Sequence, residues 1–133
     1  MKEDLIKLLE AYKPKNENIE IKVYNGYSFL HIDISGNGLQ TLFTTLSFSD
    51  DGKPLDIKLC GFDERCTETA EDFILIKELE EIAKYIGANK IYGRPKILKR
   101  KKRSEVFYTE NGYSFDFKKK DKPYLSAIIS KEF

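Results

Sequence analysis

The chain has 133 residues, of which 41% are hydrophobic and 34% charged, and its formal net charge is +1. This length is typical of one domain, which buries about two thirds of the surface that its unfolded chain exposes. The small net charge excludes a general electrostatic attraction to nucleic acid or membranes, so such a role would need a local patch.

Export and anchoring signals are not found in the sequence. The first residues mix acids and lysines into the apolar positions, unlike a signal peptide, and no apolar run approaches the roughly 20 residues that span a bilayer. Cys60 and Cys66 are too few for a disulfide framework and are expected to be free thiols. With His31 as the single histidine, no metal site is expected. We expect a cytoplasmic protein with one domain over residues 1–133.

The chain begins with a predicted helix and a predicted hairpin. Residues 3–13 carry apolar side chains at helical spacing and stop before Pro14, which cannot continue a helix. Residues 19–24 alternate between apolar and other side chains, and residues 27–34 place apolar residues on one face. Asn25-Gly26 between them tolerates the positive φ of a type I′ turn, which predicts a two-residue hairpin connection.

Two further strands are expected over residues 39–48 and 55–62, separated by the turn-forming residues 50–54. Residues 18–62 therefore read as an antiparallel meander.

The hydrophobic period then changes from two to 3.6 residues, which predicts an amphipathic helix over 70–86. Thr69 is placed to cap its start and Gly87 its end. The side chains expected in the core are Leu75, Ile76, Leu79, Ile82 and Ala83.

The last third is predicted to hold a strand over 90–97, a helix over 100–110 and a closing hairpin of 113–117 with 125–130. A strand, helix, strand unit has a right-handed crossover that brings its two strands together in parallel. We therefore expect the strand at 55–62 to lie beside the strand at 90–97, in a sheet that is otherwise antiparallel.

Two segments resemble the GNAT (GCN5-related N-acetyltransferase) superfamily. The family's main helix often shows paired apolar residues followed by Leu, Ala and Gly at intervals of three, four and four. The segment downstream often shows an Asn, which would fall on Lys101, an Ala three residues later, which would fall on Ser104, then an aromatic-Tyr pair and a Gly-aromatic pair. The matching residues here are Leu75-Ile76, Leu79, Ala83, Gly87, Ser104, Phe107-Tyr108 and Gly112-Tyr113.

The resemblance implies an α+β fold with a GNAT-like, mixed and mostly antiparallel twisted sheet and helices on both faces. It also implies transfer of an acyl group from acetyl-CoA to a small-molecule or protein amine.

The family's cofactor loop, Q/R-x-x-G-x-G/A, aligns with residues 67–72, where this chain has TETAED. In the family, the glycines of this loop let backbone N–H groups reach the CoA diphosphate at the start of the helix. The positions that the resemblance places at the cofactor are Thr67, Thr69, Ala70, Glu71, Asp72, Lys101 and Ser104. Ala70 and Asp72 occupy the two glycine positions, and the carboxylates of Glu68, Glu71 and Asp72 lie in the segment. We therefore expect acetyl-CoA to bind weakly or not at all.

Three residues are candidates for catalysis by this resemblance. Tyr108 matches the family's tyrosine, which protonates the leaving thiolate of CoA. Asp63 or Glu64, just past the fourth strand, is a candidate base for the amine. His31 is an alternative base, since its ordinary pKa suits that work. Each has an ordinary structural interpretation too: a packed aromatic, loop acids and a surface histidine.

Residues 94–103 include seven basic side chains in ten positions. Such a run could clamp the 3′-phosphate end of CoA, contact nucleic acid phosphates, or form a solvated turn and helix start.

Two functional hypotheses follow from the sequence. One is an acyl-CoA-dependent N-acyltransferase with an atypical cofactor loop. The other is a catalytically inactive GNAT-fold binding or regulatory module that uses the basic run.

Overall fold

The computed structural model describes residues 2–36, 40–62, 70–97, 101–118 and 125–133. Their helices and strands, in chain order, are α1 (Lys2–Ala11), β1 (Ile19–Asn25), β2 (Phe29–Gly36), β3 (Gln40–Phe48), β4 (Pro54–Phe62), α2 (Ala70–Ile86), β5 (Lys90–Gly93), β6 (Lys96–Ile97), α3 (Lys101–Glu110), β7 (Ser114–Lys118) and β8 (Leu125–Glu132). Among these helices, none is long and apolar enough to cross a membrane.

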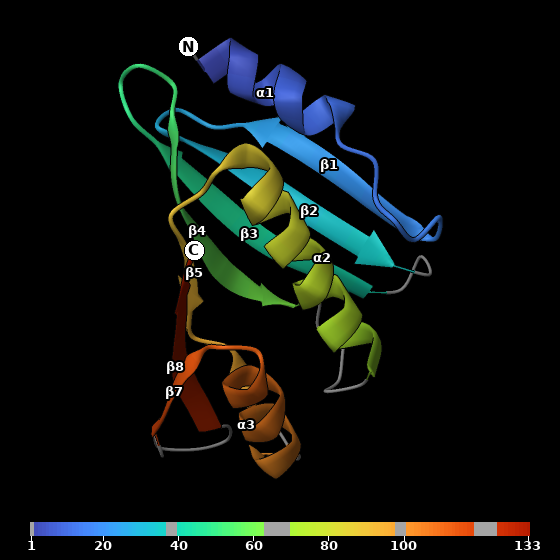
Figure 1. Ribbon diagram of the computed structural model, residues 1–133, viewed down its shortest axis with the longest axis vertical. Helices are drawn as coiled ribbons and strands as arrows, with labels where there is room; N and C mark the ends of the chain where they lie inside the picture. The colour runs from blue at the N-terminus through green and yellow to red at the C-terminus, as the bar shows by residue number, and fades with distance from the viewer. Residues whose placement is uncertain (1, 37–39, 63–69, 98–100, 119–124) are drawn as a thin grey trace.

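All eight strands belong to one sheet with the order β1-β2-β3-β4-β5-β8-β6, and β7 also pairs with β8 (Figure 1). Strands β4 and β5 are parallel, from Asp56 opposite Lys90 to Leu59 opposite Gly93. The other described pairs are antiparallel. The predicted α+β class, the mostly antiparallel mixed sheet and its parallel pair are therefore confirmed.

The first hairpin exists, but its connection is longer than predicted. Asn25 lies opposite Leu30, so four residues, 26–29, connect the paired ends of the strands. The predicted connection had only two residues. This register places Val23 opposite Ile32 and Ile21 opposite Ile34. A two-residue turn at Asn25-Gly26 would instead place Val23 opposite a serine. The apolar pairing thus overrides the local turn signal.

The core lies between α2 and one face of the sheet. Its fully buried apolar strand residues are Leu30, Ile32, Ile34, Leu42, Leu46, Ile57, Leu59, Ile91, Ala127 and Ile129. The five residues of α2 predicted to face the core are 0–1% exposed, which confirms the predicted helix face. Side chains opposite each other on neighbouring strands share a face, so the alternation along each strand builds one continuous apolar surface.

All three helices pack on this same face, which corrects the expectation of helices on both faces. Tyr12, the residue after α1, connects this helix to α2, because its hydroxyl donates a hydrogen bond to Glu78 at 2.6 Å. Helix α3 joins α2 where the Phe107 and Phe73 rings stack with centroids 4.0 Å apart. Figure 1 shows α2 crossing the sheet between the other two helices.

We call the other side of the sheet the open face. One row of opposed residues crosses it on β1 to β5: Tyr24, His31, Thr45, Lys58 and Tyr92. No described helix covers this row, and its side chains are exposed or partly exposed. The physical reason is the strict alternation of the strands, which leaves too few aliphatic residues on this side to bury a helix.

We predict that Leu79→Ala lowers the free energy of unfolding by about 2–5 kcal/mol, because it removes buried methyl groups and leaves a cavity. Chemical denaturation monitored by circular dichroism measures the change. Ile74→Ala, on the same helix but 45% exposed, is the matched control and should cost less than about 1 kcal/mol. Equal costs for the two variants would show that the helix face is misassigned.

Candidate functional site

The candidate site lies where β4 and β5 stop pairing. Their parallel register ends at Leu59 and Gly93. Strand β4 continues to Phe62 with β3 as its neighbour, whereas β5 ends at Gly93. Helix α2 then begins at Ala70. The carboxyl ends of adjacent parallel strands, next to the start of the crossover helix, are the usual position of ligand sites in open α/β sheets.

Two backbone features fix this divergence. A Cβ on Gly93 would lie 2.6 Å from the carbonyl oxygen of Leu59, so glycine is required for the close approach at the last pair. The β3–β4 register shifts between Thr44 opposite Leu59 and Phe43 opposite Gly61, which leaves Cys60 as an extra residue in a bulge. Bulges bend a strand and are common beside functional sites. The predicted single strand over 90–97 is instead divided into β5 and β6.

Tyr108 occupies the interior between α3, α2 and β7. It is 2% exposed, and its ring makes an edge contact with Phe73 at 6.3 Å and with Tyr113 at 5.3 Å. Its ring also lies 6.0 Å from that of Phe115 on β7. These are the surroundings of a core aromatic residue, and a role in proton transfer stays a prediction.

Arg103 brings part of the basic run to the start of α2. Its guanidinium carbon lies 5.0 Å from the ring centroid of Phe73, which is in the first turn of that helix. A helix start carries a partial positive charge and attracts anions. Arg103 adds a full positive charge beside it, at the end of α2 where the resemblance places a diphosphate.

The other predicted cofactor residues are only partly described. Asp63, Glu64, Thr67 and Thr69 lie outside the described residues. Ala70, Glu71 and Asp72 form the first turn of α2, and Lys101 is the first residue of α3. Ser104 is buried on α3, 2% exposed.

His31 lies on the open face, where its ring meets that of Phe29 edge-on at 5.0 Å. The sheet separates it from Tyr108, so the structure does not bring these two candidates together.

A buried ionic cluster was not predicted from the sequence. Glu80 of α2 is 3% exposed and forms an ion pair with Lys131 of β8, at 3.1 Å. The ammonium of Lys131 also lies 5.5 Å from the ring centroid of Tyr113. The available signal was the alternation of β8, which places Lys131 on the same face as the buried Ile129. A charged residue at such a position needs a partner in the core.

Two tyrosine hydroxyls near buried glutamates differ in their hydrogen bonds. Burial raises the pKa of Tyr113 well above its ordinary value, and the negative charge of Glu80 raises it further. A contact between the Tyr113 hydroxyl and Glu80 also raises this pKa, but the buried hydroxyl makes no hydrogen bond of ordinary geometry in the described chain. Burial and the hydrogen bond to Glu78 likewise raise the pKa of Tyr12.

We predict opposite effects for Tyr113→Phe and Tyr12→Phe on the free energy of unfolding. Tyr113→Phe removes an unsatisfied hydroxyl and should be neutral or stabilising by up to about 1 kcal/mol. Tyr12→Phe leaves the buried Glu78 without its donor and should cost about 1–2 kcal/mol. Urea denaturation of both variants at neutral pH measures the difference, and a clear loss for Tyr113→Phe would contradict the assignment.

The free energy of unfolding at alkaline pH provides a second test of the two tyrosines. Both tyrosines have folded pKa values above the unfolded value near 10, so their neutral forms stabilise the fold fully below that pH. This stability is lost as the pH rises above about 10, because the unfolded chain then releases protons that the folded chain retains. Each Phe variant should therefore lose less stability above pH 10 than the parent chain.

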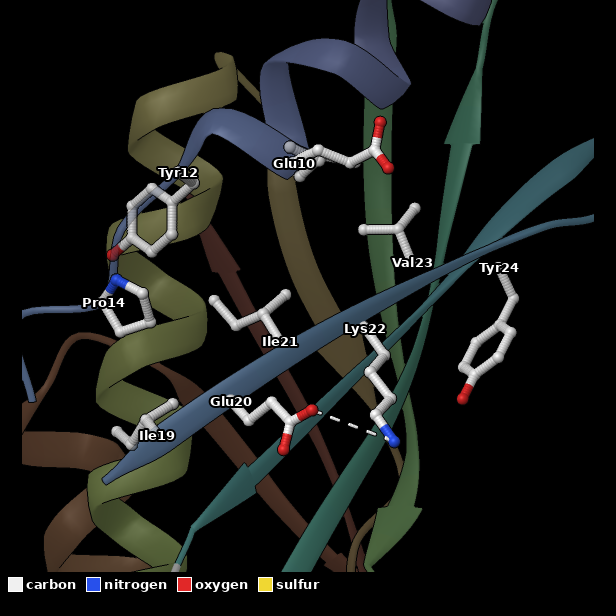
Figure 2. A pocket seen from close by; sticks show the side chains of 10 residues that line it. Glu10, Tyr12, Pro14, Ile19, Glu20, Ile21, Lys22, Val23 and Tyr24 are labelled. Atoms are coloured by element: carbon white, nitrogen blue, oxygen red, sulfur yellow. Dashed lines mark ion pairs between the residues drawn. The ribbon is translucent and has the colours of Figure 1, made fainter. Parts of the chain in front are cut away.

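The structure also shows a hollow of about 590 Å³ between α1 and β1 (Figure 2). It is lined by Leu9, Glu10, Tyr12, Pro14 and the six residues Ile19–Tyr24. Strand β1 is at one end of the sheet, whereas β7, on which Tyr108 packs, pairs with β8 near the other end. The hollow therefore lies away from α3 and Tyr108. It is not part of the candidate site.

Within the described part of the chain, no group of three or more His, Cys, Asp or Glu side chains is placed to hold a metal ion.

No family model matches the chain, and no curated protein matches it either. A solved structure of a putative phosphinothricin N-acetyltransferase is similar, with a TM-score of 0.49 and 15% identity, over 81% of this chain and 73% of that one. An uncharacterized protein from Bacillus halodurans is similar with a TM-score of 0.42 and 9% identity, over 81% of this chain and 61% of that one. At these scores the likenesses assign neither a family nor an activity to this chain.

Proposed function

We propose that this chain is an acetyltransferase-like protein of GNAT type, whose acyl-CoA site lies at the divergence of β4 and β5. The observation that carries the proposal is the position of Arg103 beside the first turn of α2. The element order, the parallel pair and the Phe107-Tyr108 and Gly112-Tyr113 segments support it as well.

In this proposal the contact with the CoA diphosphate comes from Arg103 together with the N–H groups at the start of α2. Arginine suits this task, because its planar guanidinium can hold two phosphate oxygens at once. Bound there, acetyl-CoA would supply the acetyl group for transfer to an amine. The chain's own contribution would be to orient the thioester, with Tyr108 as the acid and Asp63 or Glu64 as the base.

Glu71 and Asp72 oppose this binding, since both lie in the first turn of α2. One like-charge contact at 4 Å costs up to about 4 kcal/mol at an effective dielectric constant near 20. A third of that penalty already weakens binding about tenfold. The proposed site therefore favours the acyl-pantetheine part of the donor over its diphosphate.

We predict that acetyl-CoA binds at low salt with a dissociation constant weaker than about 10 μM, and that this binding depends on Arg103. Arg103→Gln should weaken it about tenfold, because a charge-assisted contact is lost. Lys102→Gln removes an equal charge from the neighbouring exposed side chain and should change affinity less than about threefold. Isothermal titration calorimetry measures the affinity of the parent chain and of both variants for acetyl-CoA.

Acetyl-pantetheine, which has no diphosphate, is the matched ligand control. It should bind equally well to the parent chain and to Arg103→Gln. No binding of either ligand would overturn the acyltransferase proposal. Submicromolar binding of acetyl-CoA would show that the carboxylates of α2 do not face the diphosphate.

We predict that Tyr108→Phe lowers the turnover number for amine acetylation at least about a hundredfold while leaving acetyl-CoA affinity unchanged, because general acid catalysis contributes about 10²–10⁴-fold. Release of CoA thiol in the presence of a panel of amines measures turnover. Equal turnover of the parent chain and the variant would assign Tyr108 to the core alone.

The alternative function is an inactive GNAT-fold binding or regulatory module. The observation that favours it is the burial of Tyr108, which is enclosed by aromatic side chains. In that case the basic run, with its exposed Arg94 and Lys102, would contact phosphates of a nucleic acid. Binding of single-stranded RNA that falls steeply with salt, without any binding of acetyl-CoA, would favour this function.

A further inference from the structure

Strand β1 forms one end of the sheet. It pairs with β2 along its whole length, from Ile19 opposite Gly36 to Asn25 opposite Leu30. Its other edge has no strand partner among the described residues. Such an edge presents a row of backbone N–H and C=O groups that can pair with a further strand.

The hollow of Figure 2 follows this edge. Six consecutive residues of β1 line it, so its wall includes side chains from both faces of the sheet. Ile21 and Val23, on the helix face, are only half-buried, although they pack against the core. The apolar side of β1 is therefore incompletely covered by α1.

We propose that β1 pairs in antiparallel orientation with β1 of a second copy of this chain, which joins the two sheets into one. This proposal is independent of the acyltransferase proposal, because the β1 edge lies away from the divergence of β4 and β5.

The charges of β1 favour a second copy over an unrelated strand. Glu20 and Lys22 lie on the open face, are 69% and 58% exposed, and approach each other to 3.9 Å. In an antiparallel pair centred on Ile21, Glu20 of one copy lies opposite Lys22 of the other, and the symmetry repeats the contact. Opposite charges in directly opposed positions stabilise a strand pair.

The neighbouring registers lack this complementarity. A pair centred on Glu20 opposes two glutamates, and a pair centred on Lys22 opposes two lysines, which destabilises both. Moving one strand by a single residue would place Glu20 of one copy opposite Ile21 of the other, so side chains of opposite faces of the sheet would be paired. The register centred on Ile21 also places the buried Ile19 opposite the half-buried Val23 of the second copy, so apolar side chains meet on the helix face.

Sedimentation velocity of the full chain from about 5 to about 500 μM tests the proposal, since a short strand pair is expected to associate in the micromolar range. We expect a monomer–dimer equilibrium in the parent chain. Lys22→Glu opposes an introduced glutamate to Glu20 twice and should raise the dimer dissociation constant at least about tenfold.

The charge-swapped variant Glu20→Lys with Lys22→Glu restores opposite charges in the same register and should dimerise within about threefold of the parent chain. Lys58→Glu changes the net charge equally on the central strand β4 and should leave the equilibrium unchanged. Thermal denaturation of each variant confirms that it folds.

Hydrogen exchange locates the contact. Amides of β1 should become protected as the concentration rises, whereas those of β7 should not. A chain that stays monomeric at all concentrations would overturn the proposal. So would a dimer that Lys22→Glu leaves intact, or one that the charge-swapped variant fails to restore.

Discussion

The two parts of the sheet can join only because Gly93 approaches Leu59 closely. A Cβ at position 93 would lie 2.6 Å from the Leu59 carbonyl oxygen and 2.8 Å from the Leu59 Cβ. Glycine therefore lets the short β5 lie parallel to β4, and β5 carries β8 on its other side. The antiparallel meander of β1 to β4 is thus continuous with the C-terminal strands, and α2 crosses above the junction. Beyond this contact β4 and β5 no longer pair, and β4 continues to Phe62.

Helix α2 contacts the sheet with its apolar side chains and other segments with two of its carboxylates. Its apolar side chains cover the sheet, and two of its buried carboxylates reach outward to other segments. Glu78 accepts a hydrogen bond from Tyr12, which follows α1, and Glu80 pairs with Lys131 of β8. A buried carboxylate without a partner would be costly, so each pairing restricts where the neighbouring segment can lie. The same helix directs its first turn toward Arg103 and the candidate site.

The spacing of apolar residues along the chain predicted which segments form strands and helices and which of their faces are buried. The alternation at Ile19, Ile21 and Val23, the helical spacing around Leu79 and the crossover between the fourth and fifth strands all appear in the structure. Features that depend on distant pairing were not predictable in this way. The length of the first turn follows from apolar pairs across two strands, and the placement of the described helices on one face follows from how few aliphatic residues the other face has.

In the candidate site, too, local sequence predicted the helix but not the contacts of its side chains. The helix that carries Tyr108 was expected, but its burial depends on Phe73 and Phe115, which are far from it in sequence. Arg103 appeared in the sequence only as one member of a basic run. Its place beside the start of α2 comes from the stacking of Phe107 on Phe73, which fixes α3 against α2. No periodicity contains that information.

We propose that an acyl-CoA binds at the divergence of β4 and β5. A titration of the ¹⁵N-labelled chain with acetyl-CoA, followed by backbone amide chemical shifts, tests it most directly. We expect the largest changes at Cys60, Gly61 and Gly93 and at the start of α2. Changes confined to β1 or to the open face, or no changes at millimolar acetyl-CoA, would contradict it.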